Sequence, residues 1–155
     1  MARRRFAGGK GDAMKRLETL VYHAAHLLLG GLFLYAGLIK GSDVTAFAGN
    51  VANYQLLPYS WNYLVAATLP AVEAIAGLLL LVNCRVRPAV VVLGALNLVF
   101  MVALVSVILR GLDIDCGCFN PDPVNKTSPQ LALLRDVGIM LLVVLSYWLR
   151  GRRPA

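Results

Sequence analysis

The chain has 155 residues, of which 59% are hydrophobic and 15% are charged. Its mean hydropathy is +0.69, whereas about a quarter of the residues in a soluble domain are charged. The formal net charge of +7 could suggest nucleic-acid binding. However, the basic residues sit at the chain ends and in loops, with no basic stripe interleaved with aromatic residues. The composition therefore excludes a soluble domain and a nucleic-acid partner, and it predicts contact with a lipid bilayer.

Four apolar runs are each long enough to cross a bilayer, which takes roughly 20 helical residues. They cover residues 19–39, 61–82, 89–109 and 130–149. Backbone amides in hydrocarbon must be paired within the protein, so a span is a helix or belongs to a closed barrel. Barrel strands alternate between apolar and polar residues, but these runs are apolar on all sides. We therefore expect an all-α membrane protein whose residues 19–149 form one bundle of four transmembrane helices.

Basic residues concentrate in the N-terminal segment 1–18, the turn 83–88 and the tail 150–155. Lysine and arginine near span ends mark the cytoplasmic side, and an even number of spans puts these three segments on one side. The sequence thus predicts that both termini are cytoplasmic and that loops 40–60 and 110–129 face outward. The first apolar run is too long for the core of a cleavable signal peptide, so we interpret it as a retained helix.

Two of the three cysteines lie in an outward loop, separated by one glycine: Cys116-Gly117-Cys118. Thiols outside the cytoplasm meet an oxidising environment. A disulfide between these two would close a tiny loop and stabilise the fold very little, and it would be strained and readily reduced. The pattern favours thiol–disulfide exchange. An incidental disulfide, half of a metal site and two unpaired thiols are the alternatives.

The remaining cysteine and the metal alternative have simpler interpretations. Cys84 lies at the cytoplasmic end of the second span, where a lone thiol is small apolar filler. Zinc normally takes four ligands, and only Asp113, Asp115 and distant histidines accompany the cysteine pair. We therefore expect no metal site.

Ionisable residues within membrane spans usually face the bundle interior. At about 1.5 Å per residue from the cytoplasmic span ends, Glu73 lies at a depth similar to those of His26 and Asn97. We expect these three residues to form one polar layer, in which His26 and Glu73 share a proton. The structural alternative is an interhelical hydrogen bond that holds the bundle together.

Three basic residues lie toward the outer face, on the side of the cysteine pair. They are Lys40, at the end of the first span, Arg110, at the end of the third, and Arg135, near the start of the fourth. A nearby cation favours the nucleophilic thiolate form of a cysteine. We therefore predict that Cys116 and Cys118 react and that Arg135 and Lys40 stabilise the thiolate, although each cation could instead be an interface anchor.

Four pieces of sequence spread over most of the chain carry a family resemblance. They are Tyr35-Ala36-Gly37-Leu38-Ile39-Lys40 with Phe47; Tyr54 with Pro58; Pro70, Glu73 and Gly77; and Cys116-Gly117-Cys118-Phe119 followed by Arg135. On these residues the chain resembles the MauE/DoxX group of redox-associated membrane proteins. The cysteine pair is similar to that of the MauE branch in particular. Asn120 departs from the pattern, which has a glycine at that place.

The resemblance implies a bacterial inner-membrane protein linked to disulfide chemistry outside the cytoplasm. Its expected partner is a thioredoxin-like or other disulfide-containing extracytoplasmic protein, because the MauE branch is associated with maturing the disulfide-rich subunit of methylamine dehydrogenase. In outline the fold is also similar to quinone-coupled four-helix disulfide-forming enzymes, although those carry two cysteine pairs. A quinone is therefore the candidate cofactor, and the polar layer of His26, Glu73 and Asn97 is the candidate cofactor-binding region.

Two other functions remain open at this stage. Plain DoxX-like relatives suggest a non-catalytic membrane anchor or assembly subunit of an oxidoreductase complex, with an incidental disulfide. A small transporter could instead use His26 and Glu73 for proton coupling, although the four spans show no sign of a broken helix.

Overall fold

The structure, a computed structural model, describes residues 8–112, 114 and 128–151. These residues form the helices α1 (Gly8–Ser42), α2 (Val44–Asn53), α3 (Tyr59–Leu81), α4 (Val86–Leu109) and α5 (Pro129–Gly151). Within the described ranges no strand occurs. All helices except α2 are long and apolar enough to cross a membrane. The prediction of an all-α membrane protein with four spans is confirmed.

The segment expected to be a loop at residues 40–60 instead contains α2. Asp43 caps this helix, because its side chain accepts a hydrogen bond from the Ala46 amide at 2.8 Å. The expectation of a loop was wrong because a search for long apolar runs detects only helices that can cross the bilayer. α1 also begins at Gly8, well before the expected start at Thr19, and its residues 13–20 are all exposed.

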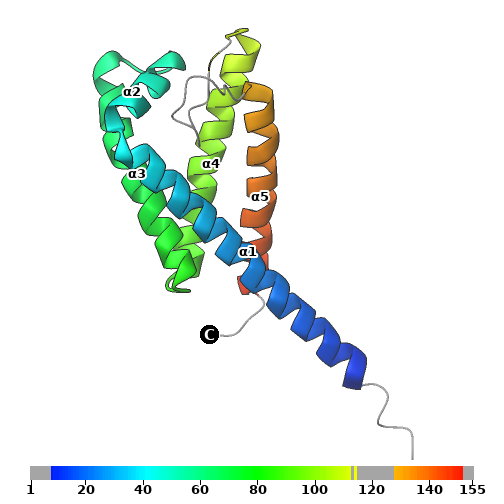
Figure 1. The fold of residues 1–155 in the computed structure, drawn as a ribbon. Coiled ribbons are helices and arrows are strands. Elements are labelled where there is room, and N and C mark those ends of the chain that lie inside the picture. Colours follow the sequence, from blue (N-terminus) through cyan, green and yellow to red (C-terminus); the bar gives the residue numbers. More distant parts are fainter. Residues whose placement is uncertain (1–7, 113, 115–127, 152–155) are drawn as a thin grey trace, which may run out of the picture.

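The bundle consists of two helical hairpins (Figure 1). The first hairpin contains α1, α2 and α3, and the second contains α4 and α5; in each, the two long helices pack on one another more extensively than across the hairpins. A short turn joins the hairpins, with Asn83 and Arg85 in the left-handed backbone region at φ 54° and 47°. α1 begins and α5 ends at the same end of the bundle, opposite the end that carries α2, which we call the α2 end.

Glycines bring the backbones of α1 and α3 close together. A Cβ atom on Gly37 would lie 2.7 Å from the carbonyl oxygen of Pro70, and one on Gly77 would lie 2.6 Å from the backbone nitrogen of Leu34. Such distances leave no room for any larger residue, and close approach of this kind is typical of packed membrane helices. These contacts set how far α1 is shifted along α3.

Replacing Gly37 by Val is expected to lower the free energy of unfolding by about 1–3 kcal/mol, the usual cost of overpacking. The matched control is Gly31→Val on the same helix, because a Cβ atom at Gly31 meets nothing within 4 Å. Thermal denaturation in detergent should show a lower midpoint for Gly37→Val alone. Equal losses in both variants would mean that the glycine contact does not limit the packing.

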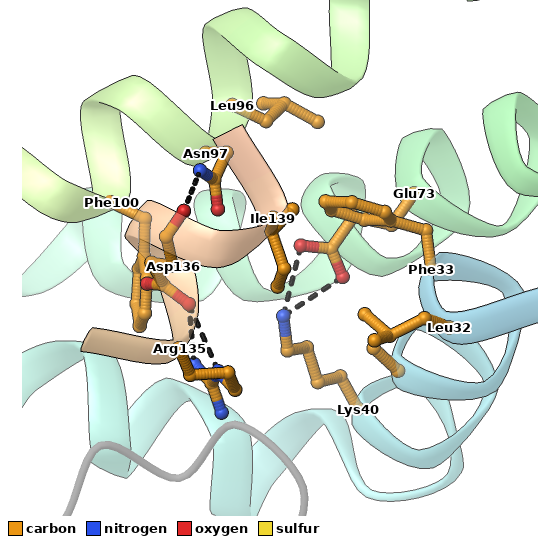
Figure 2. A pocket seen from close by; sticks show the side chains of 11 residues that line it. Leu32, Phe33, Lys40, Glu73, Leu96, Asn97, Phe100, Arg135, Asp136 and Ile139 are labelled. Carbon is orange, nitrogen blue, oxygen red and sulfur yellow. Dashed lines mark hydrogen bonds and ion pairs between the residues drawn. The ribbon is translucent and has the colours of Figure 1, made fainter. Parts of the chain in front are cut away.

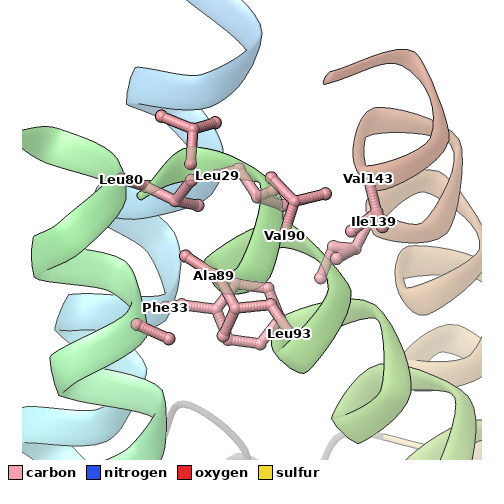
Figure 3. Packing of buried hydrophobic residues seen from close by; sticks show 10 residues of the cluster. Leu29, Phe33, Leu80, Ala89, Val90, Leu93, Ile139 and Val143 are labelled. Atoms are coloured by element: carbon pink, nitrogen blue, oxygen red, sulfur yellow. The ribbon is translucent and has the colours of Figure 1, made fainter. Parts of the chain in front are cut away.

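Apolar side chains fill the bundle at both ends. At the end opposite α2, all four long helices contribute to one cluster (Figure 3), which contains Leu29, Phe33, Ala76, Leu80, Val86, Ala89, Val90, Leu93, Ile139 and Val143. At the α2 end a smaller cluster is formed by Tyr54, Leu104, Val107 and Ala132, and the partly buried Ile114 packs against it. The buried residues Asn97 of α4 and Asp136 of α5 lie between these two clusters along their helices.

Candidate functional site

A cavity of about 40 Å³ lies between the two hairpins. Figure 2 shows five polar side chains around it, interspersed with apolar ones: Lys40, Glu73, Asn97, Arg135 and Asp136. At roughly 10–15 Å³ per water molecule, the cavity has room for a few waters. The first hairpin supplies one oppositely charged pair to this cavity and the second hairpin supplies another.

The pair in the first hairpin joins Lys40 of α1 to Glu73 of α3. The ammonium nitrogen of Lys40 donates to both carboxylate oxygens of Glu73, each at 2.9 Å. The side chains of Lys40 and Glu73 are only 9% and 7% exposed, so the ion pair is almost completely buried within the protein. Because neither charge has solvent to stabilise it, each depends on the other.

The pair in the second hairpin joins two adjacent residues of α5. The Nε and Nη2 atoms of Arg135 donate to Oδ1 of Asp136 at 2.9 and 2.8 Å. Asp136 is buried, while the Arg135 side chain remains 28% exposed. Asn97 of α4 donates to the backbone oxygen of Asp136 at 2.9 Å and so ties α4 to α5 at the same place. The two bonds to Asp136 orient the guanidinium group of Arg135 toward the buried carboxylate.

One buried oxygen in the site has no protein partner. Among the described residues, Oδ2 of Asp136 is buried and accepts no hydrogen bond. A buried carboxylate oxygen without a partner is costly, and the adjoining cavity has room for a water that would satisfy it. The arrangement can therefore hold water and protons between two ion pairs inside the bundle.

The structure brings together four of the predicted site residues, Lys40, Glu73, Asn97 and Arg135, but His26 is not among the residues that line the cavity. His26 Nδ1 lies 2.8 Å from the backbone oxygen of Tyr22, and its ring packs against the Tyr22 ring. The expected layer of His26, Glu73 and Asn97 is thus only partly present, and the contacts described for Glu73 are with Lys40.

The shift of α1 along α3 explains this difference. Gly37 meets Ala74, the neighbour of Glu73, whereas the Tyr22 hydroxyl donates to Asn83 Oδ1, beyond the end of α3. Gly30 meets Gly77 and Leu80 in the last turn of α3. His26 lies one turn further along α1, beside the end of α3 and roughly 16 Å along the α1 axis from Gly37 at 1.5 Å per residue. The predicted depth of His26 was wrong because α1 begins well before residue 19, from which that depth is measured.

Asp136 is the member of the site that the sequence prediction did not include. The signal that could have found it is an acid directly beside a base inside an apolar span, since such neighbours neutralise one another within a membrane. Cys116 and Cys118 lie outside the described residues, and Cys84 is exposed. In the part of the chain that the structure describes, no group of three or more His, Cys, Asp or Glu residues could hold a metal ion.

Comparisons with known proteins agree with the resemblance drawn from the motifs. The family described as "Methylamine utilisation protein MauE" matches residues 18–149. The MauE protein of Paracoccus denitrificans is 36% identical over 140 residues, which cover 90% of this chain and 75% of that protein. The MauE protein of Paracoccus versutus is 37% identical over 104 residues, covering 66% of this chain and 55% of that protein. No solved structure gives a significant match. The chain is a multi-pass membrane protein that belongs to the MauE family.

Proposed function

We propose that this chain exchanges disulfides, through Cys116 and Cys118, with a thioredoxin-like partner on the outer side of the bacterial inner membrane. In this proposal both chain ends are cytoplasmic and the α2 end faces outward. The names of the relatives point to methylamine utilisation as the process that it serves. Maturation of a disulfide-rich protein of that process would require such exchange.

The observation that carries the proposal is a cation held in place at the start of the helix that follows the cysteine pair. Arg135 is partly exposed, and Asp136 fixes its guanidinium group. Ile114, two residues before Cys116 in the sequence, packs against the apolar cluster at the same end. A fixed positive charge near a cysteine favours its thiolate form, which is the attacking species in exchange.

The exchange balances without any further reactant. One thiolate attacks a disulfide sulfur of the partner, and a mixed disulfide forms as the partner's second sulfur leaves as a thiolate. The other cysteine of the pair then attacks the mixed disulfide. One protein ends with a disulfide and the other with two thiols, and the reaction also runs in reverse.

Replacing Cys118 or Cys116 by Ser is expected to stop turnover, while one of the two variants should trap the partner as a stable mixed disulfide. The measurement is the redox state of the pair in intact cells, followed with a membrane-impermeant thiol reagent and by non-reducing electrophoresis. Cys84→Ser is the matched control, since Cys84 lies at the opposite end of the bundle from α2.

Full exchange in both single variants would contradict the proposal. A partner that stays bound after both cysteines are replaced, with its own redox state unchanged, would instead support a non-catalytic anchor. Labelling of the pair only after the membrane is permeabilised would reverse the proposed orientation.

A further inference from the structure

The first turns of α1 extend beyond the bundle. Tyr22 is the first described side chain of α1 to be buried, and its hydroxyl group donates to Asn83 Oδ1 in the turn between the hairpins. The side chains of residues 13–21, which precede it, are all exposed. We call these residues the α1 extension; no other described part of the chain covers them.

The α1 extension is amphipathic. At about 100° per residue, its apolar side chains fall within an arc of about 120° around the helix axis. They are Ala13, Met14, Leu17, Leu20 and Val21. The rest of the circumference carries polar side chains: Lys15, Arg16, Glu18 and Thr19. Met14, Leu17 and Leu20 are 63%, 61% and 67% exposed, so the apolar face is uncovered. An apolar stripe on one side of a helix normally packs against apolar surroundings.

The length of α1 indicates which surroundings these are. Its apolar stretch, Ala13–Ser42, has 30 residues, whereas the other three candidate spans have 23, 24 and 21. A helix that is longer than the hydrocarbon is thick tilts in the bilayer. Figure 1 shows α1 crossing the bundle at a slant, while α4 and α5 stand side by side. A tilted helix leaves the bilayer obliquely, so the α1 extension stays near the lipid headgroups.

Positive charge predominates around the α1 extension. Among the described side chains at this end of the bundle, four exposed cations outnumber one exposed acid: Lys15, Arg16, Arg85, Arg87 and Glu18. Two copies of the extension packed together would bring like charges close to one another, which disfavours self-association. An apolar face accompanied by cations instead complements anionic phospholipid, which has apolar acyl chains and negative phosphate groups.

We propose that the α1 extension lies in the headgroup region of the adjoining leaflet and binds anionic phospholipid. The apolar face, centred on Leu17, rests on the acyl chains. Arg16, at the edge of that face, reaches a lipid phosphate with its long side chain, and Lys15 adds positive charge within the headgroup region. Thr19 lies on the opposite side of the helix from Leu17 and faces water. The contact holds the first turns of α1 at the membrane surface and is separate from disulfide exchange.

The test measures the depth of two spin labels in the whole protein, reconstituted in lipid nanodiscs. The labels are attached at Leu17→Cys and at Thr19→Cys, each in a chain whose Cys84, Cys116 and Cys118 are replaced by Ser. Oxygen concentrates among acyl chains and a nickel complex stays in water, so the collision rates of a label with each report its depth. In nanodiscs that contain phosphatidylglycerol, the Leu17 label should collide mainly with oxygen and the Thr19 label mainly with nickel.

Removal of two cations should release the extension from anionic lipid. Lys15→Gln combined with Arg16→Gln should weaken its association with the surface roughly thirtyfold, since each basic residue near an anionic surface contributes about a factor of five. The collision rate of the Leu17 label with nickel should then rise. Replacing phosphatidylglycerol by phosphatidylcholine should have the same effect. Arg110→Gln, an exposed cation at the α2 end, is the matched control and should leave both labels unchanged.

Equal collision of both labels with nickel in anionic nanodiscs would mean that the extension projects into water, and it would overturn the proposal. Shielding of both labels with dipolar coupling between two copies would indicate self-association instead. Shielding of the Leu17 label in native membranes but not in nanodiscs would assign the apolar face to a protein partner. A depth that responds neither to lipid charge nor to the change at Lys15 and Arg16 would exclude recognition of anionic lipid.

Discussion

Replacing Lys40 by Met is expected to lower the free energy of unfolding by roughly 3–5 kcal/mol, the usual cost of removing one partner from a buried ion pair. Met keeps most of the length of the side chain, so the change removes the charge and little of the packing. Glu73 would be left 7% exposed, without the ammonium group that bonds to both of its oxygens. The measurement is chemical denaturation of the purified protein in detergent.

A double-mutant cycle separates loss of the pair from loss of the charge. Lys40→Met with Glu73→Met should be far more stable than the sum of the two single changes predicts, because apolar replacement of a whole buried pair is often neutral. Lys15→Met, in the exposed part of α1, is the control and should change stability by less than about 0.5 kcal/mol. Additive single effects would mean that the two charges are not coupled.

Replacing Arg135 by Leu is expected to slow disulfide exchange at neutral pH by about tenfold or more, if its charge favours the thiolate. The slowing should diminish as the pH rises, because alkali deprotonates the thiol without help from a cation. The measurement is the rate of alkylation of Cys116 and Cys118 as a function of pH. Arg135→Lys keeps the charge and should restore most of the rate.

Two controls test whether Arg135→Leu slows exchange only because it disturbs the structure. Arg135→Leu leaves Asp136 without its cation, so the stability of this variant must be measured beside its rate. Arg110→Gln is the matched control: Arg110 lies at the same end of the bundle but is exposed, and it donates to Gln55 Oε1 at 3.3 Å. Exposed charges are screened, so Arg110→Gln should change the rate little. If it slowed exchange as much as Arg135→Leu does, Arg135 would have no special role.

The four spans could be predicted because the length of an apolar run follows directly from the thickness of the bilayer. The inward-facing positions of Glu73 and Asn97 could be predicted too, since polar residues in a span avoid lipid. Both residues line the cavity. Composition and the length of apolar runs do not predict the helix between the first two spans, because α2 is too short to cross the bilayer.

The ion pair between α1 and α3 could not be predicted from the sequence of either helix alone. Lys40 bonds to Glu73 because glycine contacts shift α1 along α3, and a shift of this kind is a property of two surfaces together. Sequence reasoning had assigned Lys40 to the cysteine pair and Glu73 to His26. The role of Arg135 beside the cysteines stays a prediction, while its bond to Asp136 is a feature of the structure.

Each hairpin contains both members of its own ion pair, Lys40 with Glu73 in the first and Arg135 with Asp136 in the second. This arrangement bears on how the chain enters the membrane during synthesis. An unpaired charge at the centre of a span costs about 2.5–3.5 kcal/mol in translocon insertion. Each hairpin carries one cation and one anion that neutralise each other. It can therefore leave the translocon and enter lipid before the other hairpin has been made. The two hairpins are therefore natural units of biogenesis, and the polar cavity forms only when they meet.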